Sequence, residues 1–328
     1  MKTPDQEVLE TLHKWILNNT PCVLITVAQT WGSSPRAVGS IMCISVNGEN
    51  EGSVSGGCVE EDLIDFIKRF DFTQKKPVRR FYGVDPSQAR KFGLPCGGKL
   101  ELIIENVTRS REIGEIISAL INRKTIQRKL NLVTGGIELY EGQKDLSFYC
   151  DDNYVIKTFG PAWQMIIIGA GHLSKHLAAM TIPLGYDVIV CDPRIEHTDA
   201  WKIEYTRVDS RMPDDVVADL SDEFTAIIAL THDPKLDDMA LMQALDSKAF
   251  YVGALGSKLN SQKRLQRLAS LGVSPTGLSR LHGPVGLPIG SHTPPEIAIS
   301  ILAQVIACRN GVSLINKMSE QSENGVSV

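Results

Sequence analysis

Two cysteines of this chain stand beside paired glycines, a setting in which a thiol can do chemistry. Cys58 follows Gly56-Gly57, and Cys96 precedes Gly97-Gly98. Because glycine has no side chain, such pairs let a ligand approach the backbone closely. A thiolate is both a nucleophile and a soft metal ligand, so Cys58 and Cys96 are candidate ligands of a sulfur-coordinated metal centre.

The charges near each thiol decide how readily its thiolate forms. Cys58 precedes a stretch with helical apolar spacing, and amides at a helix start lower a thiol pKa. The acidic run 60–62 acts in the opposite direction, so the net effect on Cys58 stays open. Lys99 follows Cys96 closely and favours its thiolate. The alternative for both cysteines is a small core residue in a tight turn, since free cysteine is often buried.

Another polar segment, Gly32-Ser33-Ser34-Pro35-Arg36, carries a cation that can bind an anion. Arg36 can hold a phosphate through its planar guanidinium group. A solvated surface arginine is the alternative interpretation. Four further cysteines lie in strand or helix patterns and are expected in the core: Cys22, Cys43, Cys191 and Cys308.

A glycine loop in the C-terminal half predicts a phosphate-binding turn. The apolar run 165–168 leads into Gly169-Ala170-Gly171, and a helix is expected from His172. Gly169 permits the tight turn, and Gly171 lets the backbone approach a pyrophosphate that sits on the helix N-terminus beside His172. Ser174 takes the third glycine position and is small enough for close packing. Asp192 ends the next strand, where a carboxylate can bind the ribose hydroxyls.

Three alternatives remain beside this interpretation. Asp192 argues against a 2′-phosphate, although Arg194 is close enough to bind one. His172 and His176 are four residues apart and could face one metal, but no third ligand has a suggestive spacing. A Rossmann domain that has lost its ligand is the third alternative, because folds outlive functions.

The elements that position these residues fall into two halves and an overall α/β class. Strands are expected at 22–27, 40–46 and 100–104, and helices at 8–17 and after residue 58. Beyond residue 160 strands and helices alternate, which is typical of a parallel sheet. The expected divisions are a mixed α/β domain at 1–110, a connecting helix and hairpins at 111–160, a Rossmann-type domain at 161–312 and a mobile tail at 313–328. The strands expected in the Rossmann-type domain are 165–168, 188–191, 225–230 and 250–252, with a weaker candidate at 203–208.

Composition limits the range of partners and compartments. The 328 residues carry a formal net charge of -4, which gives no electrostatic reason to expect nucleic acid or an anionic membrane. No apolar run approaches the roughly 20 residues that cross a bilayer. The first residues show no signal-peptide pattern, so we expect a cytoplasmic protein with reduced cysteines. A homodimer is the ordinary expectation for such a chain.

Taken together, the motifs resemble those of the xanthine dehydrogenase accessory family, which includes the CoxI-like proteins. The resemblance runs from about Trp15 to Asn310, and it is most specific in the two cysteine motifs. It departs from the family at Ser174 and in 287–289. The matching segments are Gly32–Arg36, Ser55–Glu60, Leu94–Gly98, Gly169–Leu173, Asp192–Arg194, Thr231–Asp233, Gly253–Ser257 and Gly283–Gly290.

The resemblance implies a role in the handling of the molybdenum cofactor. Such proteins hold the cofactor, protect it while a cysteine desulfurase exchanges an oxo ligand for sulfur, and help to insert it into xanthine dehydrogenase or a related molybdenum hydroxylase. A thiolate at Cys58 or Cys96 suits a sulfur-ligated metal, and the Rossmann-type half suits a pterin with a phosphate or nucleotide. This interpretation expects no turnover and therefore no catalytic residues.

Two other function classes compete with the chaperone interpretation. An NAD-dependent oxidoreductase needs a proton-transfer group, and His232 at a strand end could serve. The alternative role for His232 is a cap on the helix that starts near Pro234. A redox sensor would read nucleotide through the Rossmann-type half and thiol state through Cys58 and Cys96. We rank the chaperone first because a plain dehydrogenase leaves both cysteine-glycine loops unexplained.

Overall fold

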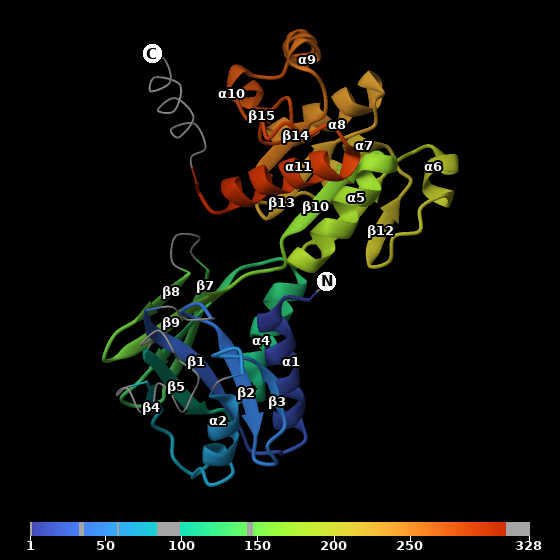
Figure 1. Cartoon of the computed structure of the whole chain (residues 1–328). Helices are drawn as coiled ribbons and strands as arrows, with labels where there is room; N and C mark the ends of the chain where they lie inside the picture. The colour runs from blue at the N-terminus through green and yellow to red at the C-terminus, as the bar shows by residue number, and fades with distance from the viewer. Residues whose placement is uncertain (1, 33–35, 58, 84–98, 143–146, 313–328) are drawn as a thin grey trace, which may run out of the picture. The chain divides into compact units, whose positions relative to one another are not determined.

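The structure divides into two units, and each is described by itself. It is a computed structural model that describes residues 2–32, 36–57, 59–83, 99–142 and 147–312. The N-terminal unit spans Lys2–Pro161, and the Rossmann unit begins at Ala162 (Figure 1). Segment 111–160, expected as a connector, belongs to the N-terminal unit.

Two antiparallel sheets form the framework of the N-terminal unit. The five-stranded sheet has the order β3-β2-β1-β5-β4, and the four-stranded sheet has the order β7-β6-β9-β8. The strands of the larger sheet are β1 Cys22–Trp31, β2 Ile41–Ser45, β3 Asn50–Gly52, β4 Val78–Tyr82 and β5 Lys99–Asn106. Those of the smaller sheet are β6 Ile126–Asn131, β7 Ile137–Glu141, β8 Phe148–Cys150 and β9 Tyr154–Phe159.

Helices cover both faces of the five-stranded sheet, which explains why β1 is apolar on both sides. Side chains alternate along a strand, so Val23 and Ile25 face one layer while Leu24 faces the other. The first layer contains α2 (Glu60–Ile67), and the second contains α1 (Pro4–Leu17) and α4 (Ser110–Ile121). Both faces of the sheet are therefore buried.

A buried ion cluster joins the two sheets of the N-terminal unit. The Arg128 guanidinium on β6 donates to both carboxylate oxygens of Glu105 on β5, at 2.8 and 2.7 Å. It also donates to Glu112 of α4 at 3.1 Å. All three residues are buried. Two carboxylates and one guanidinium thus connect a strand of each sheet and a helix.

The Rossmann unit has a parallel sheet with the strand order β12-β11-β10-β13-β14-β15. Chain order reverses between β10 and β13, which creates the crevice where such folds bind ligands. The strands are β10 Gln164–Ile168, β11 Asp187–Cys191, β12 Thr206–Asp209, β13 Thr225–Ala229, β14 Tyr251–Ala254 and β15 Leu281–His282. The helices are α5 His172–Thr181, the 3-10 turn η1 Ile182–Leu184, α6 Ile195–Asp199, α7 Pro213–Leu220, α8 Pro234–Asp246, α9 Lys258–Ser270, α10 Pro275–Leu278 and α11 Pro294–Arg309.

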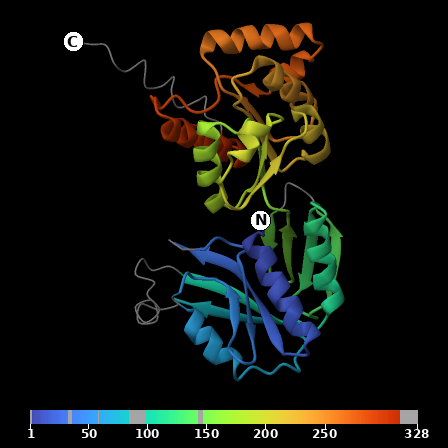
Figure 2. The same cartoon turned by 90° about the vertical axis from the view of Figure 1, so that its right-hand side faces the viewer.

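Helices cover both faces of this sheet (Figures 1 and 2), and an apolar cluster fills the space on each side. Helices α5 and α11 pack on one face through Leu177 and Ile301. Helices α7, α8 and α9 pack on the other face through Val217, Leu241 and Leu268. The predicted fold class, a Rossmann-type parallel sheet after an N-terminal mixed α/β part, is confirmed. No helix within the described ranges is long and apolar enough to span a bilayer.

Local differences from the expected elements have clear physical causes. Strand β4 escapes detection because Arg79 and Arg80 interrupt its apolar pattern; their guanidinium groups pair with Glu101 and Asp62 in the fold. Strand β1 runs on to Trp31, inside the segment expected as a loop, because β5 continues to pair with it. The weaker strand candidate at 203–208 is real but begins at 206.

We predict that Arg128→Met destabilises the N-terminal unit by about 3–5 kcal/mol, because it leaves two buried carboxylates without their cation. Urea unfolding followed by tryptophan fluorescence measures this change. Arg111→Met is the matched control, since Arg111 is exposed and its pair with Glu115 contributes about 0.5 kcal/mol or less. Equal unfolding midpoints for the two variants would contradict the assigned role of Arg128.

Candidate functional site

Three motif segments of the N-terminal unit depart from the same end of the five-stranded sheet. Strand β1 ends at Trp31, which pairs with Lys99 at the start of β5. Strand β4 ends at Tyr82, opposite Leu100. Strand β3 runs antiparallel to β2 and ends at Gly52, toward the same end. The segments after Trp31, after Gly52 and between Tyr82 and Lys99 therefore begin at the same end of the sheet, although β3 and β4 are its two edge strands.

These segments carry the three site residues predicted in this unit. Arg36 is described and exposed, and its Nε donates to Ser53 Oγ at 3.3 Å. Two of the motif segments thus touch each other. Cys58 and Cys96 lie outside the described residues, so their predicted roles stay predictions.

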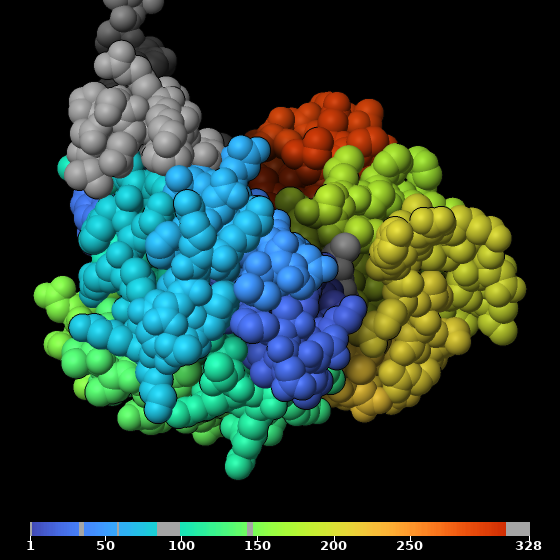
Figure 3. Space-filling view, turned by 90° about the horizontal axis from the view of Figure 1, so that it is seen from below, coloured from blue at the N-terminus to red at the C-terminus, as the bar shows by residue number. Residues whose placement is uncertain are grey.

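The end of β4 is tied to the helix that follows the first cysteine motif. Tyr82 donates its hydroxyl to Asp62 of α2 at 2.8 Å, and Arg80 donates to the same carboxylate oxygen at 2.6 Å. Helix α2 lies on the surface of the N-terminal unit, in the light-blue part of Figure 3. The described flanks of both cysteine segments are therefore joined through one carboxylate.

The carboxylate of Glu60 organises the loop before α2. Its Oε1 accepts from the backbone amides of Val54 at 3.1 Å and Ser55 at 2.9 Å. Its Oε2 accepts from the amides of Gly57 at 3.0 Å and Val59 at 3.1 Å. The hydroxyls of two loop serines, 53 and 55, also donate to this carboxylate. One side chain thus satisfies four backbone donors on both sides of position 58.

These hydrogen bonds change which backbone amides of the first cysteine motif are available to a thiolate. The sequence suggested that amides at the helix start would be available to a Cys58 thiolate. The amides of Gly57 and Val59 instead donate to Glu60. Burial alone would raise the pKa of Glu60, but the donors from Ser53 and Ser55 outweigh it and lower the pKa to about 2. A carboxylate that is ionised at neutral pH therefore lies in this loop.

In the Rossmann unit, Gly169 occupies a position that no other residue fits. Its backbone φ is +102°, in the left-handed region that favours glycine. Its amide donates to Cys191 O at 2.7 Å, which ties the loop to β11. A Cβ at this position would lie 2.9 Å from the Cα of Thr231. The turn therefore requires glycine for reasons of conformation and packing.

Gly171 differs, because nothing in the described protein requires it to be glycine. Its φ of -85° suits any residue, and a Cβ there would meet no atom within 4 Å. It is the N-cap of α5 and provides no capping side chain, and His172, the first helical residue, is exposed. Ser174, in the third glycine position, is fully buried. The space beside Gly171 is what the approach of a phosphate would need.

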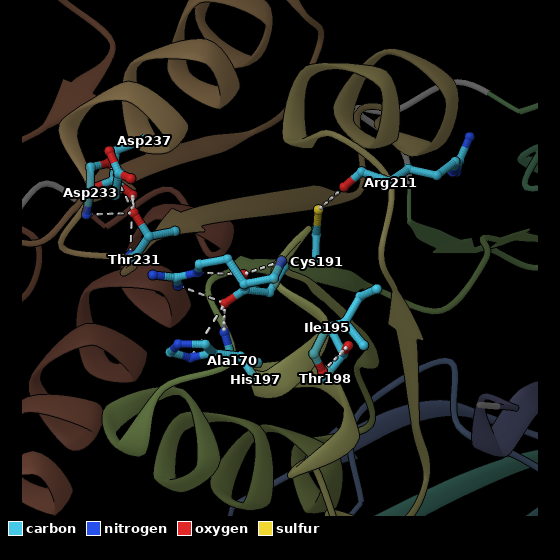
Figure 4. Close-up of polar contacts among 11 residues, drawn as sticks. Ala170, Cys191, Ile195, His197, Thr198, Arg211, Thr231, Asp233 and Asp237 are labelled. Atoms are coloured by element: carbon cyan, nitrogen blue, oxygen red, sulfur yellow. Dashed lines mark hydrogen bonds and ion pairs between the residues drawn. The ribbon is translucent and has the colours of Figure 1, made fainter.

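Asp192 holds the glycine loop from β11. Its Oδ2 accepts from the amide of Ala170 at 2.8 Å, and the Arg194 guanidinium donates to both carboxylate oxygens at 2.8 Å. Burial would raise the pKa of Asp192, but these hydrogen bonds outweigh it and lower the pKa. His197 Nδ1 lies 3.9 Å from the same carboxylate, and Figure 4 shows His197 beside Ala170.

The sequence assigned Asp192 to the ribose hydroxyls, and the structure gives the carboxylate a different set of partners. Both oxygens already accept hydrogen bonds from the protein, and the side chain is fully buried. Arg194 covers it and remains partly exposed. In this arrangement the group at the end of β11 that can meet a ligand is the Arg194 cation.

The interpretation of His232 as a helix cap is wrong. Asp233 is the N-cap of α8, and its carboxylate accepts from the Lys235 amide at 2.9 Å. The loop is held by Asp237, whose Oδ1 accepts from the amide and hydroxyl of Thr231 at 3.1 and 2.7 Å (Figure 4). His232 itself is exposed and has a backbone φ of +63°.

The cysteines expected in the core are buried or partly buried. Cys22 and Cys43 lie in β1 and β2, Cys191 lies in β11, and Cys308 lies in α11. Burial raises the pKa of Cys22 and of Cys191 to about 12, and it also raises the pKa of Cys43. These thiols stay protonated at neutral pH, so they are internal references for thiol reactivity.

The fold defines a two-unit protein with a Rossmann-type domain and an antiparallel domain whose sequence carries the two cysteine-glycine motifs. Residues 165–305 match the XdhC Rossmann domain, and residues 15–78 match the XdhC and CoxI family. The chain belongs to the XdhC and CoxI family.

Three similar proteins extend the comparison over nearly the whole chain. The molybdenum cofactor insertion chaperone PaoD of Escherichia coli (strain K12) is 26% identical over 315 residues, which cover 93% of this chain and 92% of that protein. A probable xanthine dehydrogenase subunit of Bacillus subtilis (strain 168) is 26% identical over 320 residues, with 89% and 94% covered. The crystal structure of a xanthine dehydrogenase from Bacillus halodurans has the same fold, with a TM-score of 0.72, 22% identity, and 96% and 99% covered.

Glu60→Gln should destabilise the N-terminal unit by about 1–3 kcal/mol at pH 7, because a neutral amide is a weaker acceptor for the loop donors. The lowered pKa means that the ionised carboxylate stabilises the fold fully above its unfolded pKa of roughly 4.3, and that this stabilisation is lost as pH falls toward 2. The difference between wild type and variant should therefore shrink in that window. Urea unfolding at a series of pH values measures it.

Glu61→Gln is the control, because Glu61 is the next residue of α2 and is exposed. It should leave the unfolding curve nearly unchanged at every pH. If Glu60→Gln behaved like this control, Glu60 would not hold the loop.

Proposed function

We propose that this protein is a chaperone of the molybdenum cofactor in the cytoplasm, which holds the cofactor and delivers it to a molybdenum hydroxylase such as xanthine dehydrogenase. The observation that carries the proposal is the convergence of the Arg36, Cys58 and Cys96 segments at one end of the five-stranded sheet. The name of PaoD, a molybdenum cofactor insertion chaperone, supports it.

In this proposal the N-terminal unit supplies soft ligands and a cation. The thiolates of Cys58 and Cys96 hold molybdenum or protect its terminal sulfur, because sulfur ligands suit such a centre. Arg36, exposed beside Ser53, can turn toward an anionic part of the cofactor. The Glu60 carboxylate fixes the backbone on both sides of position 58, which limits the ordering needed when the cofactor binds.

The Rossmann unit supplies a place for the phosphate or nucleotide part of the cofactor, or for an adenine nucleotide such as NAD. The fit rests on Gly171, where a phosphate can approach a helix N-terminus that carries no capping side chain. Arg194 adds a cation at the end of β11. With Asp192 holding Ala170, the loop has its shape before a ligand arrives.

The same proposal names the other proteins involved. The client is a molybdenum hydroxylase, as the name of the Bacillus subtilis relative suggests. A cysteine desulfurase acts on the held cofactor by exchanging an oxo ligand for sulfur. The chaperone works as a homodimer and has no turnover of its own, so its activity is measured as activation of the client.

Replacement of both loop cysteines tests the molybdenum proposal. Cys58→Ala with Cys96→Ala should reduce the molybdenum retained per chain at least severalfold and reduce activation of the client enzyme. Metal analysis of protein from a host that makes the cofactor measures the first effect. The control is Cys22→Ala with Cys43→Ala, which removes two buried thiols of raised pKa. Equal molybdenum in wild type and in the loop variant would exclude these thiols as ligands.

Gly171→Val tests the glycine loop separately. A branched side chain there should block the approach of a pyrophosphate and weaken nucleotide binding at least tenfold, which corresponds to about 1.4 kcal/mol. Calorimetric titration with nicotinamide and cytidine nucleotides measures the affinity. Ala179→Val, on the exposed side of the same helix, is the control and should bind as wild type. Unchanged affinity in a folded Gly171→Val protein would place the nucleotide elsewhere.

A further inference from the structure

A cavity of about 470 Å³ lies in the Rossmann unit beside the ends of β13 and β14. Its wall includes His232 after β13, Leu255 and Gly256 after β14, and the basic residues Lys263 and Arg264 of α9. We propose that this cavity is a second anion site, which binds a phosphate group at a place distinct from the glycine loop.

The charge on the cavity wall favours an anion. Three cations of α9 line it: Lys263, Arg264 and Arg267. Arg264 pairs with Asp237 at 3.1 Å, and Arg267 pairs with Asp238 at 2.8 Å. Lys263 is exposed and has no hydrogen-bond or ion-pair partner among the described residues. One positive charge is thus left for a ligand after the two carboxylates of α8 are neutralised.

The arginine pairs also hold the cavity open and in shape. The Arg264 side chain is 8% exposed, and besides Asp237 its guanidinium donates to Leu255 O at 3.0 Å. Asp237 in turn holds the backbone of Thr231, next to His232. The buried pair therefore connects both loops of the cavity wall to α9, and a ligand meets a preformed surface.

Buried polar atoms without partners give an independent indication of a ligand. Arg264 Nε is buried and has no hydrogen-bond partner in the described structure, with Asp238 Oδ1 3.7 Å away. The hydroxyl of Ser261, a residue 3% exposed, is likewise unsatisfied there. Buried polar groups usually have partners, so the unpaired Nε of Arg264, a wall residue, points to an oxygen-bearing ligand or its water. Ser261 Oγ lies 3.7 Å from the position of a Cβ on Gly256, a wall residue.

The N-terminus of α9 also favours an oxyanion at the cavity. Gly256 and Ser257 lead into α9, a helix of 13 residues whose first amides point toward its N-terminal end. Ser257 caps the helix by accepting from the Asn260 amide at 3.2 Å. Glycine at 256 keeps the approach to this helix start free of a side chain.

Two sequence motifs that the proposed function leaves without a role meet at this cavity. His232 comes from Thr231–Asp233, and Leu255 and Gly256 come from Gly253–Ser257. Gly169 packs against Thr231, so the cavity wall and the glycine loop lie on neighbouring strands of one sheet edge. The phosphate can come from a free anion or from the far end of a nucleotide held at Gly171. Neither source requires the protein to carry molybdenum.

Titration of the full chain with inorganic pyrophosphate and with cytidine diphosphate tests the site, with calorimetry for affinity and histidine-ring NMR for location. His232→Asn identifies the His232 resonance. We expect at least one ligand to bind and to shift that resonance, and Lys263→Gln to weaken binding at least fivefold. Lys248→Gln, an exposed lysine at the opposite end of β14, should have no effect. Lys263 is exposed, so the variant should fold.

Gly171→Val distinguishes this site from the glycine loop and from the proposed function. Pyrophosphate binding that survives Gly171→Val but falls with Lys263→Gln supports a free anion in the cavity. Cytidine diphosphate binding that falls with both variants supports the phosphate of a nucleotide that spans both places. Binding unaffected by Lys263→Gln, binding that leaves the His232 resonance unmoved, or no binding of either ligand at roughly 10 mM would overturn the proposal.

Discussion

Backbone amides in a loop need acceptors, and in this protein single carboxylates supply them at three of the described motif loops. Glu60 accepts from four amides around position 58, Asp192 accepts from Ala170, and Asp237 accepts from Thr231. A buried or half-buried carboxylate is costly unless it is matched by such donors. Loop and acid therefore stabilise each other, and each motif keeps one shape that a ligand can use without first ordering the chain.

Each unit brings motif loops from distant parts of the sequence together, but the two units use different kinds of sheet. In the N-terminal unit, antiparallel pairing brings the segments after Trp31, Gly52 and Tyr82 to one end of a sheet. In the Rossmann unit, parallel pairing sends every strand end to one edge, where Gly169 meets Thr231. Both arrangements bring motifs from distant parts of the sequence to one end of a sheet.

Three arginines of this protein differ in how fully the fold satisfies the donors of their guanidinium groups. Arg128 forms ion pairs with Glu105 and Glu112, so its role is to stabilise the fold. Arg194 combines two properties: it neutralises Asp192, and it remains partly exposed to a ligand. Arg264 is buried like Arg128, yet its Nε has no partner in the described structure. The same residue type is thus structural or ligand-directed according to how many of its donors the fold satisfies.

The sequence by itself determined the elements whose pattern is local: the apolar run 165–168, the glycine turn at 169–171 and the alternation of strand and helix. It also identified Cys22, Cys43 and Cys191 as core residues. Tertiary structure decided the partners of the polar groups, because a carboxylate takes the nearest donors in space. Asp192 therefore holds Ala170 and Arg194, where the sequence suggested ribose, and Asp233 caps the helix assigned to His232. The cavity at Arg264 was invisible in the sequence, since its wall joins 232, 256 and 264 through contacts that no local pattern records.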